Sequence, residues 1–273
     1  MPQSTMGDDV TVQAARHPAD ALTGCRVESR GPDSSAVVLA LPEQAASLGH
    51  LGMLADVSTA QAMAGAIPEG QGFVTLGLHL HLVGTVVPGS YVRGIGERLS
   101  FDGTSGLGRA LLTNPDGSIA AAATGRFMVV EVGTKNTGTI RRQPLADLEP
   151  PDDWDWALGI VSREHADGTA VLRAVPHPEV RNQAPMMHGG VHLRALELAM
   201  RAAIDEPGRQ PVLADLEVTF HRPAPADGQT AVLLRAAVER RSRRVITATG
   251  SLEATDGRLL SSGRATFLRP NEA

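Results

Sequence analysis

The residues best suited to chemistry lie in one run of the second half of the chain. Asn182 is followed six positions later by His188, which precedes Gly189 and Gly190, and Glu197 comes nine positions after the histidine. Two glycines that lead into a helix offer backbone N–H groups without intrahelical partners. The positive end of the helix dipole lies at the same point, so this turn can hold the oxygen of a polarised carbonyl.

The same pattern recurs in the first half of the chain in a reduced form. Ser47 and Gly49 stand where the second half has His188 and Gly190, and Asp56 follows Ser47 by nine positions. No asparagine precedes this copy, since position 41 is leucine. Later landmarks repeat at nearly the same offset: Asp116-Gly117 with Asp256-Gly257, Phe127 with Phe267, and Gly89 with Gly228. These ordered matches predict that one domain is present twice.

Each acid lies too far along its helix to serve the start of that helix. Glu197 is seven residues beyond Gly190, which is about 10 Å at a rise of 1.5 Å per residue. If the two central helices run antiparallel across a pseudo-twofold axis, each acid instead approaches the start of the other helix. We therefore expect sites that are shared between the two copies.

The elements that must position these residues can be read from apolar periodicity and turn signals. Helical spacing predicts one central helix in each half, at about 48–67 and 190–203. Extended stretches separated by Gly, Pro and Asp turns predict strands in the first half at 36–41, 73–87, 90–101, 107–113 and 119–132. In the second half, strands are predicted at 156–161, 170–174, 212–222, 230–240, 245–254 and 259–269. A curled antiparallel sheet wrapped around one central helix in each unit is an α+β fold.

We expect four segments along the chain. An N-terminal extension covers 1–34, with order beginning near Ser35, and a first repeat covers 35–132. A linker rich in Asn, Thr, Gly and Pro covers 133–154, and a second repeat covers 155–273.

Composition narrows the classes of function and partner. The formal net charge of −5 gives no general attraction to nucleic acid or to anionic membranes. The single cysteine, Cys25, cannot form an intramolecular disulfide and favours a reducing compartment. No run of about 18 apolar residues and no apolar signal-peptide core is present. We therefore expect a cytoplasmic protein that binds neither nucleic acid nor a membrane.

Several catalytic and cofactor motifs are missing. The sequence has no His/Cys/carboxylate cluster with zinc spacing, so we expect no metal and no cofactor. We expect the histidines that alternate with apolar residues to be structural or pocket-lining: His79, His81, His192 and His221. The sequence also lacks a Gly-x-Ser-x-Gly elbow and a phosphate-binding glycine loop, which excludes serine-hydrolase and nucleotide-hydrolysing classes.

Taken together, these residues resemble the hotdog-fold acyl-CoA thioesterase superfamily, particularly its phenylacetyl-CoA thioesterase-like branch, in a tandem double-hotdog form. The resemblance depends on Asn182, the His188-Gly189-Gly190 turn, the acid nine positions after the histidine, and a later strand that ends at Phe220-His-Arg-Pro223. It covers about 35–132 and 155–269. It implies hydrolysis of an acyl thioester to a carboxylic acid and free coenzyme A, with no metal or redox cofactor.

The resemblance implies one working site that combines both repeats. Asp56 would act as general base or nucleophile, and the Gly190 N–H would stabilise the oxyanion. Asn182 would orient water or the acyl carbonyl, while His188 would shape the turn and polarise the same carbonyl. Gly189 would let the substrate approach the backbone closely.

A second site would combine Glu197 with Ser47 and Gly49, and we expect it to be degenerate because it lacks both the histidine and the asparagine. The arginine run of the second repeat could hold the phosphates of coenzyme A. Its members are Arg240, Arg241, Arg243 and Arg244.

Two alternatives to hydrolysis stay open: hydration or dehydration of an acyl thioester on the same scaffold, and binding of acyl-CoA without catalysis. The acyl chain, and the choice between coenzyme A and a carrier protein, also stay open. Because hotdog sheets expose an edge, we expect whole chains to assemble into a homo-oligomer.

Overall fold

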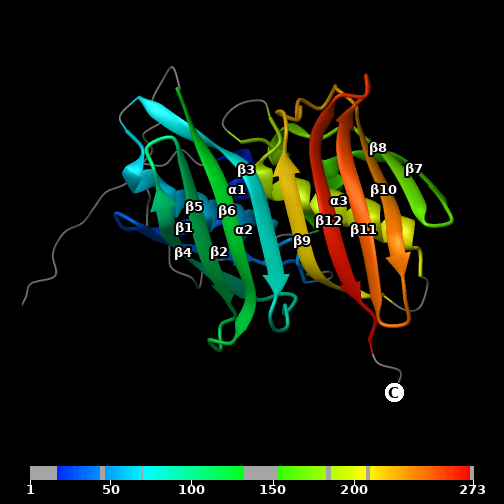
Figure 1. The fold of residues 1–273 in the computed structure, drawn as a ribbon, viewed down its shortest axis with the longest axis horizontal. Coiled ribbons are helices and arrows are strands. Elements are labelled where there is room, and N and C mark those ends of the chain that lie inside the picture. Colours follow the sequence, from blue (N-terminus) through cyan, green and yellow to red (C-terminus); the bar gives the residue numbers. More distant parts are fainter. Residues whose placement is uncertain are drawn as a thin grey trace, which may run out of the picture.

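The computed structural model describes residues 17–43, 47–68, 70–131, 153–182, 186–206 and 210–270. Within these residues the strands form one 12-stranded antiparallel sheet in the order β1-β2-β4-β5-β6-β3-β9-β12-β11-β10-β8-β7. The first six positions of this order belong to the first repeat and the last six to the second (Figure 1). The repeats are therefore joined through the pairing of β3 with β9.

The first unit contains one long helix and a meander. Its elements are α1 (Pro18–Thr23), β1 (Arg26–Arg30), β2 (Ser34–Ala40), α2 (Gly52–Met63), the 3-10 helix η1 (Ala64–Ala66), β3 (Gln71–Leu82), β4 (Tyr91–Phe101), β5 (Ser105–Thr113) and β6 (Ile119–Glu131).

The second unit repeats this plan. Its elements are η3 (Trp154–Leu158), β7 (Ile160–Ala166), β8 (Thr169–Ala174), η4 (Pro178–Val180), α3 (Gly189–Ile204), β9 (Val212–Phe220), β10 (Val232–Arg241), β11 (Val245–Ala254) and β12 (Leu259–Leu268). The tandem double-hotdog architecture that the sequence predicted is confirmed.

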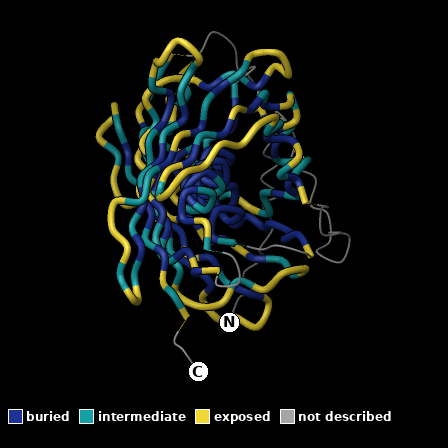
Figure 2. Tube along the Cα trace, turned by 90° about the vertical axis from the view of Figure 1, so that its right-hand side faces the viewer, coloured by how far each residue is buried: buried dark blue, intermediate teal, exposed yellow. Residues whose placement is uncertain are grey.

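The two long helices, α2 and α3, lie on the same face of the sheet (Figure 2). Helix α2 packs on strands of the first repeat and α3 on strands of the second, and the two helices also contact each other. Their contact is close because glycines lie in it: a Cβ added to Gly190 would lie 2.5 Å from the Cα of Met53, and one added to Gly52 would lie 2.6 Å from the Gly190 oxygen. The helices therefore meet at their N-terminal ends, which the crosswise arrangement of acids requires.

The structure differs from the predicted elements at two places. Order begins before Ser35, because α1 packs beside η4 and β1 pairs with β2 as an edge strand of the sheet. The predicted strand at 156–161 is a 3-10 helix over Trp154–Leu158, followed by β7. Asp153 caps this helix by accepting a hydrogen bond from the Asp155 N–H, and Gly159, with φ of 64°, ends it.

The expected linker at 133–154 falls outside the described residues except for its last two positions. The proposed segment boundaries therefore stay predictions. Among the described helices, none is both long and apolar enough to cross a membrane.

Candidate functional site

Asp56 lies on α2 of the first repeat and reaches the start of α3 in the second. It is 4% exposed, and its Oδ2 accepts a hydrogen bond from the Gly190 N–H at 3.0 Å. The Thr75 hydroxyl on β3 donates to the other carboxylate oxygen, Oδ1, at 3.1 Å. The acid is therefore held from both repeats, and its orientation is fixed at each oxygen.

His188 is the N-cap of α3 and touches the same carboxylate. Its Nδ1 lies 3.2 Å from the Gly190 nitrogen and 3.2 Å from Asp56 Oδ2. A neutral ring with a bare Nδ1 accepts from the Gly190 N–H, whereas a protonated ring donates from Nδ1 to Asp56. Burial lowers the pKa of His188, but the hydrogen bond and the charge of Asp56 outweigh it and raise this pKa above its usual value of 6.5.

A cavity of about 400 Å³ opens beside these residues. Asp56, Asn182, His188 and Gly189 lie in its wall, and so does Thr75. Much of the remaining wall is apolar and comes from both repeats: Val57, Phe73, Leu76, Met128, Met186 and Phe220. The structure thus brings Asp56 and Asn182, 126 positions apart in the sequence, to one cavity.

The two glycines of the turn occupy different positions. Gly189 lines the cavity, and a Cβ added to it would lie 2.5 Å from Asp56 Oδ2. The Gly190 N–H, which we expected to hold the oxyanion, is instead directed at Asp56 Oδ2, and Gly190 packs against α2. In this structure Gly190 holds the acid, while Gly189 is the glycine that borders the space for a substrate.

Sequence reasoning missed two contributors from the N-terminal segment. His17 and Asp20, at the start of α1, lie in the cavity wall, and the rings of His17 and His188 meet edge to face with centroids 5.6 Å apart. The Ala19 N–H donates to the Arg181 oxygen at 3.1 Å and fixes α1 on the second repeat. Nothing in the local sequence links this segment to a motif that lies more than 160 positions away.

The four alternating histidines divide between the cavity wall and the outer face of the sheet. His192 and His221 line the cavity, and burial lowers the pKa of His192 to about 4, so this ring is neutral at physiological pH. His79 and His81 alternate with the buried Leu78 and Leu80 and therefore lie on the outer face, away from the cavity. Of the two roles expected for these histidines, structural or pocket-lining, the structure does not place His79 and His81 in the cavity wall, and the structural role stays a prediction.

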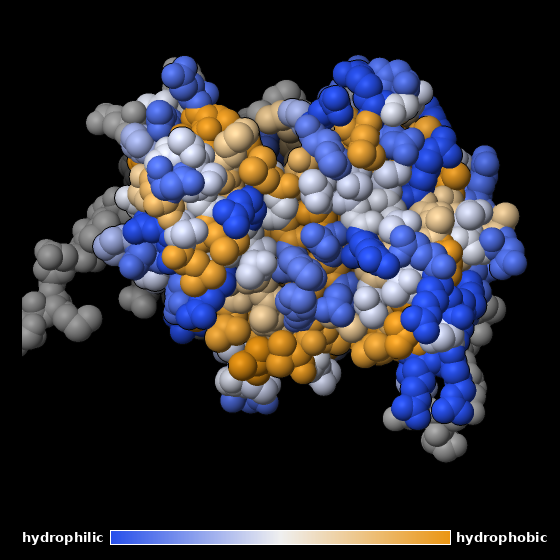
Figure 3. All heavy atoms as spheres, in the orientation of Figure 1, coloured by the Kyte–Doolittle hydropathy of each residue, from blue (hydrophilic) through white to orange (hydrophobic). Residues whose placement is uncertain are grey.

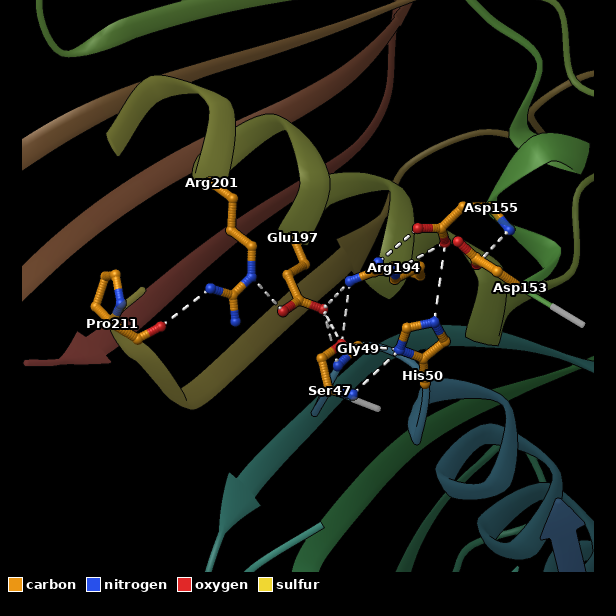
Figure 4. A network of polar contacts seen from close by, with 9 residues as sticks. All are labelled: Ser47, Gly49, His50, Asp153, Asp155, Arg194, Glu197, Arg201 and Pro211. Atoms are coloured by element: carbon orange, nitrogen blue, oxygen red, sulfur yellow. Dashed lines mark hydrogen bonds and ion pairs between the residues drawn. The ribbon is translucent and has the colours of Figure 1, made fainter. Parts of the chain in front are cut away.

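The second site is closed by charge pairs (Figure 4). Glu197 is fully buried, and its Oε2 accepts from the Gly49 N–H at 3.1 Å and from the Ser47 hydroxyl at 2.6 Å. Arg194 donates to the same oxygen at 3.0 Å, and Arg201 donates to Oε1 at 2.7 Å. Both carboxylate oxygens are thus bonded to guanidinium groups.

These arginines decide the protonation of Glu197. Burial alone would raise its pKa, but Arg194 and Arg201 together with the Ser47 hydroxyl lower it to about 2. Arg194 also pairs with Asp155 at 2.8 Å, which extends the network to η3. A carboxylate held in this way is suited to joining the two repeats.

The arginine run does not reach the cavity. Arg241 donates to Glu206 at 2.6 Å and to the Ile204 oxygen at 3.0 Å, so the β10–β11 hairpin lies at the C-terminal end of α3. Gly190 is fourteen residues away along that helix, about 21 Å at 1.5 Å per residue. The expectation that this run holds the phosphates of coenzyme A stays a prediction. The arginine that does line the cavity is Arg222.

Known proteins are similar to this chain in two respects, the fold of the chain and the sequence of part of the second repeat. Residues 184–261 match the family model "Thioesterase superfamily". The tesB protein of Mycobacterium avium subs paratuberculosis has a similar structure, with a TM-score of 0.64 at 17% identity over 90% of this chain and 96% of that one. A putative oleoyl thioesterase of Lactobacillus plantarum gives 0.61 at 14% identity over 88% and 98%. The acyl-CoA thioesterase II TesB2 of Mycobacterium marinum gives 0.55 at 12% over 90% and 96%.

The curated proteins gave no sequence match. The fold and the site nevertheless define a class: a tandem double-hotdog chain whose second repeat carries the sequence pattern of the thioesterase superfamily. The resemblance to hotdog-fold acyl-CoA thioesterases is thereby confirmed. The narrower phenylacetyl-CoA branch stays a prediction.

Proposed function

We propose that this protein is an acyl-CoA thioesterase with one working site, formed by Asp56 of the first repeat and the start of α3 in the second. The observation that supports this most directly is the placement of the Asp56 carboxylate, 3.0 Å from the Gly190 nitrogen and in the wall of a largely apolar cavity. An acyl chain fits such a wall, and the polar end of the cavity faces its thioester.

In the proposed reaction, Asp56 takes a proton from a water molecule, and the oxygen of that water adds to the thioester carbonyl. The oxyanion that forms is held by the Gly189 N–H at the positive end of α3. Collapse of the intermediate breaks the carbon–sulfur bond. The thiolate of coenzyme A then takes the proton from Asp56, which returns the site to its first state.

The surrounding side chains position these groups. Thr75 fixes one oxygen of Asp56, and the Gly190 N–H fixes the other. Asn182 orients the water or the carbonyl from the cavity wall, and His188 shapes the turn that presents Gly189. No metal or redox cofactor takes part in this proposal.

We assign the recognition of coenzyme A to an exposed part of the cavity wall. Arg222 lines it beside Pro223, at the end of the strand pair formed by β9 and β12. A guanidinium binds phosphate well, so Arg222 is the candidate contact for the cofactor half of the substrate.

The test is a screen of acyl-CoA substrates of increasing chain length with detection of the free thiol. Wild-type protein should release thiol from at least one substrate, and Asp56→Asn should lose that activity while circular dichroism shows that it remains folded. Acyl-CoA binding without thiol release would favour the non-catalytic alternative. A change in enoyl-CoA absorbance without thiol release would favour a hydratase.

A further inference from the structure

A group of metal-binding residue types lies on the outer face of the sheet, where the repeats join. His79 and His81 are two positions apart on β3 and face the same side, because side chains alternate along a strand. On β9, Asp215 is the register partner of His81, and Glu217 is the partner of His79. One ligand atom from each of His79, His81 and Asp215 lies within 4.8 Å of the others.

The group is accessible to solvent ions. The side chains of His81 and Asp215 are 44% and 41% exposed. In the view of the outer face, hydrophilic side chains lie over the middle of the sheet, where β3 and β9 run next to each other (Figure 3). The group of His79, His81 and Asp215 is therefore separate from the cavity, which lies on the side of the sheet that the helices cover.

The donor set matches a borderline transition metal. Imidazole and carboxylate are the ligands of Zn²⁺ in many proteins, at about 2.0 to 2.2 Å from the ion. Only a neutral imidazole can bind a metal.

Binding requires a small rearrangement. His81 Nδ1 and Asp215 Oδ1 are 2.6 Å apart and share a hydrogen bond. Two ligands of one tetrahedral zinc ion lie about 3.3 Å apart, given the ligand distances of about 2 Å. The two ligand atoms must therefore move apart by about 0.7 Å, and because both side chains are partly exposed, small rotations of their side-chain bonds can provide this.

A second group of similar composition does not qualify. His50, Asp153 and Asp155 also lie within 4.8 Å of one another. The guanidinium of Arg194 already bonds both oxygens of Asp155, and His50 is 1% exposed. A cation there would have to displace a buried arginine, which costs more than metal binding at an open face.

We propose that His79, His81 and Asp215 form a zinc-binding site that links the two repeats across the β3–β9 junction. Glu217 or water completes the coordination. Since two ligands come from one repeat and one from the other, bound Zn²⁺ holds the junction together and stabilises the folded chain. This proposal is independent of the thioesterase reaction.

The experiment uses full-length, untagged protein that has been treated with EDTA and dialysed. ZnCl₂ is titrated calorimetrically, and the melting temperature is measured with and without Zn²⁺. The test variant is His79→Ala combined with His81→Ala. The control is His165→Ala, which removes another exposed histidine whose Nδ1 lies 3.4 Å from a carboxylate, that of Asp205, but which belongs to no group of three possible metal ligands among the described residues.

Wild type and the control should bind one Zn²⁺ per chain in this titration and melt at a higher temperature with Zn²⁺ present. The double variant should bind at least about tenfold more weakly and lose the thermal shift, while its metal-free melting temperature stays close to that of wild type. No binding by wild type, or equal binding and an equal thermal shift in the double variant, would overturn the proposal.

Discussion

The two acids at the helix starts have different surroundings although their positions are related. Asp56 accepts from Gly190 and lines a cavity, whereas Glu197 accepts from Gly49 and from two guanidinium groups. A base needs space for water beside it. The Asp56 site offers that space, while the Glu197 site is filled by charged side chains that satisfy the carboxylate.

This contrast predicts unequal effects of two matched substitutions. Asp56→Asn removes the base from the site that has Asn182 and His188, so kcat should fall by about 10² to 10⁴. Glu197→Gln should lower kcat by less than about threefold in protein that remains folded. Thiol release under saturating substrate measures both.

Stability provides the control for this comparison. Glu197→Gln leaves Arg194 and Arg201 without their buried partner, which should destabilise the fold by about 3 to 5 kcal/mol. The pKa of Glu197 is lowered from 4.5 to about 2, so its contribution is present above pH 4.5 and is lost as the pH falls toward 2. An inactive but folded Glu197 variant beside an active Asp56 variant would reverse the assignment of the working site.

The pH dependence of the reaction should report His188. A protonated His188 donates from Nδ1 to Asp56 Oδ2 and occupies the lone pair that water needs. Activity should therefore rise as the pH passes the raised pKa of His188, with a midpoint of kcat/KM above 6.5. Burial lowers the pKa of His17 and His192, so neither ring produces a limb in this range. An unchanged midpoint in His188→Gln would contradict this assignment.

His188 and Glu197 contribute to the stability of the fold in opposite ways as the pH changes. A raised folded-state pKa means that its contribution is fully present below pH 6.5 and is lost as the pH rises through the raised value. Low pH therefore favours the His188–Asp56 ion pair, and higher pH favours turnover. The melting temperature of wild type relative to His188→Gln should decline across the pH range in which activity increases.

At the scale of elements, the short helix α1 closes one side of the cavity. It is attached to the second repeat through the Ala19–Arg181 hydrogen bond, and its His17 ring packs against His188. Aromatic contacts of this kind contribute about 0.5 to 1.5 kcal/mol. The N-terminal segment that precedes the first repeat therefore contributes to the site that the two repeats share.

His17→Ala should lower kcat/KM by about 2- to 12-fold, which corresponds to the loss of that contact. The matched control is His177→Ala, which removes a ring that packs on Trp156 with centroids 5.3 Å apart and does not line the cavity. Initial rates with one acyl-CoA at subsaturating concentration measure kcat/KM for each variant relative to wild type. Equal losses in the two variants would show that α1 acts only on stability.

Several of these elements could be predicted because their signals are local. Turn residues such as Asp116-Gly117 and Asp256-Gly257 bound the strands of each meander, and apolar spacing marks both helices. Strand β1 and helix α1 could not be predicted, since they are ordered by contacts with distant residues. His81 of β3 lies 134 positions before Asp215 in the sequence, and His79 lies slightly further away. Only the register of β3 with β9 brings the three residues together.

At the scale of the whole molecule, the continuous sheet leaves two ends. Strand β1 is the last strand on one side and β7 the last on the other. On β7, Val161 is 58% exposed, and Trp156 in the preceding η3 is 55% exposed. Unpaired edges with exposed apolar side chains favour pairing with another chain.

We therefore expect whole chains to associate through such an edge. Light scattering coupled to size exclusion at micromolar concentration should give a mass that is a multiple of 28.6 kDa. Val161→Lys places a charge on the outer strand without touching the cavity and should shift the mass toward a single chain. The matched control is Val212→Lys, at a residue of β9 that is 47% exposed and pairs with Leu268 of β12, on a strand that is not at either end of the sheet. A wild-type mass of 28.6 kDa would refute the oligomer. An oligomer whose mass is unaffected by Val161→Lys would show that β7 is not in the interface, and would place the interface at β1 or on a face of the sheet.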